Sequence, residues 1–256
     1  MLDPRGTFFA AGMVPGVSDP AALDLQRLVS PAKFAPFLRY SQSPEQAKRL
    51  YIWNVELSEC FLGPIALVEV AMRNLMNDAM CTHFGVSPAT GWHTLALGDH
   101  PRIHLLPRHL DRLNRSVNKL NRHGSSSPTG DDVVGATTLG LWVSLVDKGI
   151  ARTDGGRLDY YQRLWLPFLH RAFPGYSNPR RPGPLRDALS KFERLRNRVA
   201  HHERIYNMDA AHQIENIITL ATWLDADLGR YIEKSHSVHD CIAARANALS
   251  NGDCRL

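Results

Sequence analysis

The sequence has little cysteine and no long apolar run, and each absence excludes a class of protein. The four cysteines include no C-x-x-C pair and no spacing typical of zinc ligands, which argues against a disulfide framework or a zinc ribbon. No window approaches eighteen uninterrupted apolar residues, so we expect no membrane span. The first residues do not resemble a signal peptide, and a reducing cytoplasm is the expected setting.

Common cofactor and metal motifs are also missing. There is no phosphate-binding glycine loop, no dinucleotide fingerprint and no H-E-x-x-H zinc motif. His100 and His104 lie four residues apart, with His93 and His109 nearby, but no cysteine or carboxylate completes a metal site. The sequence therefore predicts neither a metal nor a cofactor. A formal net charge of +5 permits binding to a polyanion without requiring it.

Apolar residues recur at helical spacing along most of the chain, without strand-like alternation and without internal repeats. This pattern predicts an all-α bundle in one domain over residues 21–234, with a flexible arm over 1–20 and a flexible tail over 235–256. Ser43 should cap a long helix that Gly63-Pro64 kinks or divides. Further helices are expected at 21–30, 31–40, from 99–101 to about 124, 131–147, 185–203 and 209–228. The aromatic residues expected in the core are Trp142, Tyr160, Tyr161 and Trp165.

The segment from Arg196 to Glu203 brings together four kinds of polar side chain. On a helix, the apolar residues before it form one stripe, composed of Leu185, Leu189, Phe192, Leu195 and Val199. Arg196 falls near the middle of this stripe. An unpaired buried charge costs several kcal/mol, so Arg196 needs a carboxylate, a phosphate or a second subunit beside it. Asn197 and His201 share an adjacent stripe, and Glu203 lies two turns beyond Arg196.

Guanidinium, amide, imidazole and carboxylate groups are suited to cleaving a phosphodiester, because arginine binds phosphate oxygens and histidine transfers protons near neutral pH. Arg196 and His201 are about 140° apart around an ideal helix, so one helix does not aim both at one atom. Two copies related by a two-fold axis would pool their residues. The alternative is a structural network in which Arg196 pairs with Glu203 or Glu69 and His202 caps the helix.

Three stretches of the chain resemble one protein family. The stretch from Arg196 to Glu203, RNRVAHHE, resembles the R-x4-6-H signature of HEPN domains and, more narrowly, the motif of the Abi-like proteins, which are bacterial abortive-infection relatives. Val68–Asn74 is similar to the family's amino-terminal E-x-x-x-R-N helix, and Thr138–Val143 resembles its central L-x-F-G-x-W segment. The resemblance covers roughly residues 45–225, in the expected order.

This resemblance implies a helical bundle of HEPN type with additional N-terminal and central helices, homodimerisation, and metal-independent endoribonuclease activity. A 2′-hydroxyl would attack its own phosphate and leave a 2′,3′-cyclic phosphate. Arg196 would stabilise the transition state, His201 would act as general base or acid, and Asn197 would orient the reacting groups. His202 also satisfies the family's looser spacing, and Glu203 would support the site.

The biological setting that the resemblance implies is antiphage defence, or a toxin that stops growth. An antitoxin protein or a noncoding RNA would then be a further partner, besides the RNA substrate. The rival hypothesis is a non-catalytic helical module that kept the fold and binds RNA or protein.

Two other groups of residues are candidates for a supporting role. Glu69 and Arg73, four apart on one helix, form either an internal salt bridge or, with Asn74, a second wall of an RNA pocket. A basic helix flank and a second basic patch usually indicate a solvated face, but they are the first candidates for phosphate contacts if RNA binds. These basic residues are Arg108, Arg112, Arg115, Lys119, Arg180 and Arg181.

Overall fold

The computed structural model describes residues 19–98, 101–122, 128–150 and 158–255. These residues contain no β-strand, and a single isolated antiparallel bridge joins Gly149 to Asp159. The predicted all-α class is therefore confirmed. By its internal contacts the chain divides into two compact units, one formed by residues 1–56 and 243–256 and the other by residues 57–242. This division replaces the expected single domain over 21–234.

The smaller unit begins with short helices whose starts follow the sequence signals. Its complete helices are η1 (Pro20–Ala22), α1 (Leu25–Leu28) and α2 (Pro31–Tyr40), and it also holds the beginning of α3 (Pro44–Phe84) and the end of α11 (Val238–Asn251). The Ser30 hydroxyl accepts a hydrogen bond from the Lys33 amide at 3.4 Å. The Ser43 hydroxyl accepts one from the Gln46 amide at 3.2 Å, which confirms Ser43 as the cap of the long helix.

The expected flexible tail over 235–256 is wrong. Most of this segment forms α11, in which Val238, Cys241 and Ala248 are buried. Farther on, the Arg255 amide donates to a carboxylate oxygen of Glu56 at 3.2 Å. The sequence pattern is weak here because small residues, instead of large aliphatic ones, make the buried face.

The end of the expected amino-terminal arm is also held in place. Residues 1–18 lie outside the described part of the chain, but Asp19 accepts a hydrogen bond from Arg49 Nε at 3.0 Å. This bond lowers the pKa of Asp19 to about 2. Arg49 also donates to the carbonyl of Leu249 at 3.4 Å, so one guanidinium links the beginning and the end of this unit.

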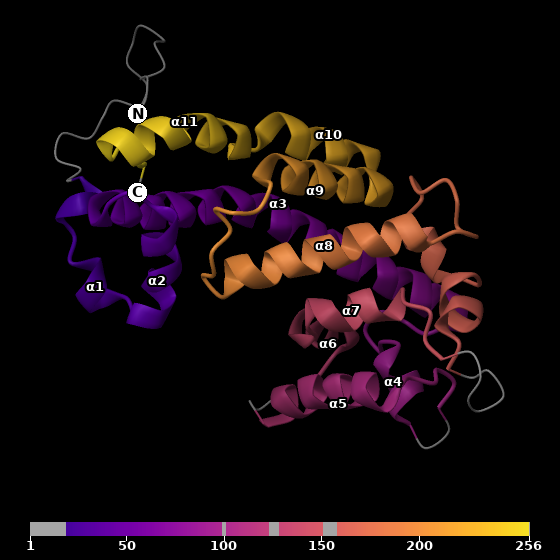
Figure 1. Cartoon of the computed structure of the whole chain (residues 1–256). Helices are drawn as coiled ribbons and strands as arrows, with labels where there is room; N and C mark the ends of the chain where they lie inside the picture. Colours follow the sequence, from indigo (N-terminus) through magenta and orange to yellow (C-terminus); the bar gives the residue numbers. More distant parts are fainter. Residues whose placement is uncertain (1–18, 99–100, 123–127, 151–157, 256) are drawn as a thin grey trace, which may run out of the picture. The chain divides into compact units, whose positions relative to one another are not determined.

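In the larger unit, α8 (Gly183–Ala200) packs against α7 (Leu139–Leu145) and α9 (Ala210–Leu224), and α9 packs against α10 (Ala226–Ser235), as Figure 1 shows. Of the predicted core aromatics, Trp142, Tyr160 and Trp165 are fully buried. Tyr161 is only half-buried. Gly63-Pro64 does not divide α3, because a proline removes one helical hydrogen bond while its buried neighbours Phe61, Ile65 and Val68 hold the helix in place.

Two of the central helices differ from the sequence expectation. The helix expected from 99–101 begins only at α5 (Pro107–Arg122), after the short helix α4 (His93–Leu97). The amides of Arg102 and Ile103 both donate to the Leu95 carbonyl, at 2.8 and 3.2 Å, which holds the intervening chain in a turn.

The helix expected over 131–147 is divided into α6 (Gly130–Ala136) and α7. The division occurs at Thr137, whose buried hydroxyl donates to the Val134 carbonyl and accepts from Trp142 Nε1, both at 2.7 Å. A Cβ added at Gly140 would lie 2.7 Å from a carboxylate oxygen of Glu193, whereas one added at Gly135 would meet nothing within 4 Å.

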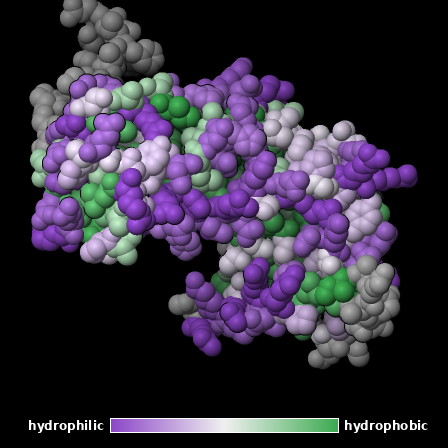
Figure 2. Space-filling view, in the orientation of Figure 1, coloured by the Kyte–Doolittle hydropathy of each residue, from purple (hydrophilic) through white to green (hydrophobic). Residues whose placement is uncertain are grey.

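Figure 2 shows the hydropathy of one face of the molecule. On the face drawn in Figure 2, hydrophilic residues cover most of the described surface, and hydrophobic residues show in smaller areas. None of the described helices combines the length with the low polarity that a membrane crossing requires. The candidate functional residues all belong to the larger unit.

Candidate functional site

The predicted apolar stripe of α8 is confirmed, and it positions Arg196. Every member of the stripe is at most 3% exposed, and the members are Leu185, Leu189, Phe192, Leu195 and Val199. Arg196 lies beside them with 31% of its side chain exposed. Its Nε donates to Glu69 Oε2 at 2.8 Å and its Nη2 donates to Glu69 Oε1 at 3.3 Å. The carboxylate that Arg196 requires is therefore the buried Glu69 of α3, 127 residues earlier in the chain.

Glu69 binds a second guanidinium, that of Arg73, which lies one turn further along α3. Arg73 also donates from Nη1 to the Gly135 carbonyl at 3.3 Å. Burial of Arg73, reinforced by the positive charge of Arg196, lowers the pKa of its guanidinium, while Glu69 opposes the shift. Because arginine stays protonated in proteins, one carboxylate faces two cations and the trio keeps a positive charge.

Arg73 carries one unsatisfied polar atom. Among the described residues its Nε is buried without a hydrogen-bond partner. Arg73 and Asn74 also line one pocket of about 480 Å³, together with Val70, Asn77, Asp78, Asp131, Val134 and Gly135. The internal salt bridge of Arg73 with Glu69 is therefore present, and Arg73 also lines a pocket. That RNA enters this pocket stays a prediction.

α8 ends three residues earlier than expected, at Ala200, in a Schellman motif. The His202 amide donates to the Val199 carbonyl at 3.1 Å, and the Glu203 amide donates to the Arg198 carbonyl at 2.8 Å. His202 has a φ of 51°, the only positive value at a non-glycine among the described residues. The left-handed backbone at His202 ends the helix, which is why Glu203 does not continue the helical line of Arg196.

Asn197 and His201 are both exposed near this helix end. The His201 backbone amide donates to the Asn197 carbonyl at 3.0 Å, so the two residues are fixed one turn apart. Within the described chain no hydrogen bond or ion pair joins either side chain to Arg196. The structure thus brings Arg196 together with Glu69 and Arg73, and leaves the amide and the imidazole on an adjacent, open surface.

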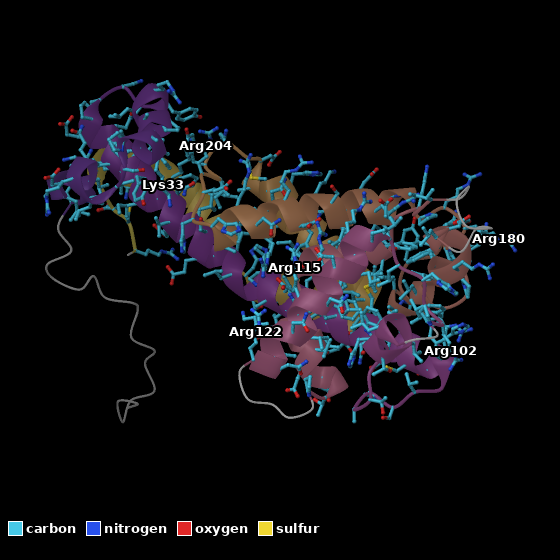
Figure 3. The ribbon with its side chains drawn as sticks, turned by 90° about the horizontal axis from the view of Figure 1, so that it is seen from below. Lys33, Arg102, Arg115, Arg122, Arg180 and Arg204 are labelled. Carbon is cyan, nitrogen blue, oxygen red and sulfur yellow. The ribbon has the colours of Figure 1, made fainter. Side chains whose placement is uncertain are left out.

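Three of the basic candidates of α5 have partners within the described chain. Arg108 donates from Nε to His109 Nε2 at 3.1 Å, and Arg112 donates to the Gly140 carbonyl at 3.4 Å. Arg115 pairs with Asp111 at 2.6 Å, and together with Asn118, Lys119 and Arg122 it lines a hollow of about 280 Å³. In Figure 3, Arg115 and Arg122 extend from α5, whereas Arg180 lies on a separate segment. Arg180 and Arg181 line another pocket, in which sequence reasoning missed Lys148 and Arg186.

A buried polar network around His109 was also missed. Burial lowers the pKa of His109 to about 4, and the nearby arginines of α5 reinforce this effect. Because Nε2 accepts from Arg108, the proton of the neutral ring is on Nδ1, which donates to the Tyr160 hydroxyl at 3.0 Å. That hydroxyl also accepts the Leu106 amide at 2.7 Å, and burial raises the pKa of Tyr160 to about 12.

The histidines that the metal hypothesis considered have other surroundings. His93 and His109 are buried, and His100 lies outside the described residues. Among the described residues, no group of three or more histidine, cysteine, aspartate or glutamate side chains could hold a metal ion.

Comparison with known proteins adds nothing to this geometry. No protein family model, no curated protein and no solved structure matches the chain. The function is therefore argued from the arrangement of the residues themselves.

Proposed function

We propose that the protein is a metal-independent endoribonuclease of the Abi-like, HEPN type. The observation that carries this proposal is the fork of two hydrogen bonds from Arg196 to Glu69. It joins the two sequence motifs that carry the resemblance, 127 residues apart in the chain. The arginine that it fixes is still partly exposed, five residues before His201. A guanidinium held in a defined orientation suits the stabilisation of a pentavalent phosphate.

The reaction follows from the chemistry of the exposed groups. His201 removes the proton of a 2′-hydroxyl or protonates the leaving 5′-oxygen, because imidazole exchanges protons near neutral pH. Arg196 stabilises the negative charge that develops on the phosphate oxygens, and Asn197 orients the reacting groups through its amide. The 2′-oxygen forms a bond to phosphorus while the 5′-oxygen leaves. The product carries a 2′,3′-cyclic phosphate, and no metal-bound water is required.

The proposal includes a homodimer, because residues spaced like Arg196 and His201 face about 140° apart on an ideal helix, and one copy does not aim both at one atom. A two-fold axis would let Arg196 of one copy and His201 of the other act on one phosphate. The surface beside the site suits such a contact. Leu62, Leu67 and Val70 of α3 are 52, 40 and 57% exposed, and Val70 lines the same pocket as Arg73. A second copy that covered this apolar face would lie next to the Arg73 pocket.

The decisive experiment is cleavage of RNA by the purified protein in the presence of EDTA. We expect the wild type to cut and to leave ends whose mass corresponds to a 2′,3′-cyclic phosphate. Arg196→Lys keeps the charge but loses the two-pronged geometry, so it should cut poorly. Complete inhibition by EDTA, or full activity in Arg196→Lys, would refute the mechanism.

Mixing two inactive variants tests the dimer. Arg196→Ala and His201→Ala should each be inactive alone, and unfolding and refolding them together should restore part of the activity through mixed dimers. The control is the same treatment of each variant by itself. No recovery, with both variants folded by circular dichroism, would show that the residues are not shared between copies.

The cellular role that we propose is cytoplasmic antiphage defence or growth arrest, with restraint by an antitoxin protein or a noncoding RNA. Its rival is a non-catalytic module that binds RNA or protein. The basic residues of α5 favour RNA over protein for that rival, because Arg115, Lys119 and Arg122 line one hollow. RNA binding without cleavage, unchanged in Arg196→Lys and His201→Ala, would support it.

A further inference from the structure

A basic pocket lies beside the start of α8, away from the Glu69 site. Its volume is about 480 Å³, and its lining includes the cations Lys148, Arg180, Arg181 and Arg186 with one carboxylate, Asp159. Four positive groups and one negative group leave a formal charge of +3 (4 − 1) around one hollow. This charge is much denser than the chain average, since the whole sequence carries +5 over 256 residues.

The charge state of this pocket follows from the ion pairs that the described residues form. Within the described part of the chain, none of the four forms an ion pair. Asp159, the carboxylate among them, accepts the backbone amide of Gln162 at 3.1 Å. By contrast, Arg115 on the nearby helix α5 pairs with Asp111 at 2.6 Å. The pocket therefore has positive charge available for an anion.

The loop that carries two of the arginines is fixed in position by aromatic side chains. Trp165 Nε1 donates to the Pro179 carbonyl at 2.6 Å, the Tyr161 hydroxyl to the Arg180 carbonyl at 2.9 Å, and the Tyr176 hydroxyl to the Arg181 carbonyl at 2.5 Å. Three consecutive carbonyls thus accept hydrogen bonds from aromatic side chains, of which Trp165 is buried. A preordered backbone reduces the entropy that a ligand must overcome when it binds.

We propose that this pocket binds phosphate groups of a nucleic-acid strand. Guanidinium groups match phosphate oxygens in geometry, and exposed lysine and arginine side chains supply the sequence-independent part of nucleic-acid affinity. The choice of RNA as the strand rests on the proposed function, whereas the binding of phosphate groups does not. Arg186 and Arg196 are ten residues apart on α8, or about 15 Å along the helix axis.

Binding can be measured separately from cleavage. The probe is a fluorescent 12-nucleotide single-stranded RNA, titrated with His201→Ala protein at several salt concentrations and followed by fluorescence anisotropy. Adding Arg181→Gln or Arg186→Gln to this protein should weaken binding equally for unrelated sequences. Each should also reduce the slope of log Kd against log salt by about 0.7 to 1, the value for the loss of one phosphate contact.

The matched control is Arg194→Gln in the same protein. It removes the same charge from an exposed position of the same helix, outside this pocket. If the pocket variants change the slope no more than Arg194→Gln does, net charge alone explains the effect and the proposal is refuted. RNA binding too weak to detect at low salt would also refute it.

A second probe, inorganic pyrophosphate, distinguishes a nucleic-acid strand from a small phosphate ligand. If pyrophosphate protects the wild type against thermal unfolding and the pocket variants lose this protection while RNA binding is unchanged, the pocket binds small phosphates and the proposal is wrong. Failure of the proposed nuclease appears differently. In that case wild-type protein leaves the RNA intact, while Arg181→Gln and Arg186→Gln still reduce the salt slope.

Discussion

The arginines toward the two ends of α8 have opposite surroundings. Arg196, near the end of the helix, is bound by the buried Glu69, which also binds Arg73. Arg186, at the start, shares a pocket with Arg180 and Arg181, and no ion pair neutralises any of them within the described chain. Burial requires a partner for a charge, whereas exposure does not. Substitution of Arg196 should therefore reduce stability, and substitution of Arg186 should reduce the binding of phosphate groups.

The largest expected effect is on the rate of RNA cleavage, and it concerns His201 instead of the arginines. His201→Ala should lower the single-turnover rate of RNA cleavage by about 10²- to 10⁴-fold, the usual contribution of a general acid or base. Because His201 is exposed, the melting temperature should not change. His239→Ala, which removes another exposed histidine, is the control and should keep the full rate. An unchanged rate in His201→Ala would assign the activity to another site or to a contaminant.

Loss of the buried carboxylate should have the largest effect on stability. Glu69→Gln leaves two guanidiniums without a negative partner, and breaking a largely buried ion pair costs about 3 kcal/mol. Urea denaturation of the two proteins measures the difference. Arg181→Gln, in the basic pocket at the start of α8, serves as the comparison and should change stability by less than about 0.5 kcal/mol. An equal loss of stability in the two variants would show that Glu69 contributes no more to the free energy of unfolding than Arg181 does.

Acid should lower the stability that the protein gains from the buried pair of His109 and Tyr160. The pKa of His109 is about 4 in the folded protein, below the value of about 6.5 expected after unfolding. Between these values the unfolded chain binds more protons, so stability falls as pH is lowered through this window. The loss from pH 7 to pH 4.5 should be about 2 kcal/mol.

Other groups titrate over the same range, so the test compares two proteins. His109→Asn should be less stable at pH 7 but should lose about 2 kcal/mol less than the wild type on acidification. Urea denaturation at both pH values measures this difference. Parallel losses in the two proteins would show that His109 does not report on the stability of this network.

The spacing of apolar residues in the sequence predicted the helices and their buried faces where large apolar residues recur regularly. The stripe of α8 was predictable because large apolar residues recur every three or four positions and Arg196 interrupts them. The pairing of Arg196 with Glu69 was one of two alternatives, since helical spacing does not decide between a neighbour and a residue 127 positions away. α11 was missed because its buried face contains small residues such as Ala248 and Cys241.

Tertiary contacts decided the remainder of the site. Arg180-Arg181 was visible as a basic pair, but Lys148 and Arg186 joined it only through the folding of the connecting loops. The end of α8 was misplaced because a histidine adopts the left-handed backbone that a glycine usually occupies at this position. No sequence signal marked His202 for this conformation, although it had been considered as a helix cap.

The smallest expected effect separates the two adjacent histidines. His202→Gly should stabilise the protein by up to about 1 kcal/mol, because glycine adopts a positive φ without the steric cost that a side chain has. The greater backbone freedom of glycine in the unfolded chain offsets part of this gain. If His202 serves only as the helix cap, RNA cleavage by this variant should equal that of the wild type. Thermal denaturation and a cleavage assay on the same preparation provide both values. A stabilised but inactive His202→Gly protein would make His202 the proton-transfer group and leave His201 as the spacer before it.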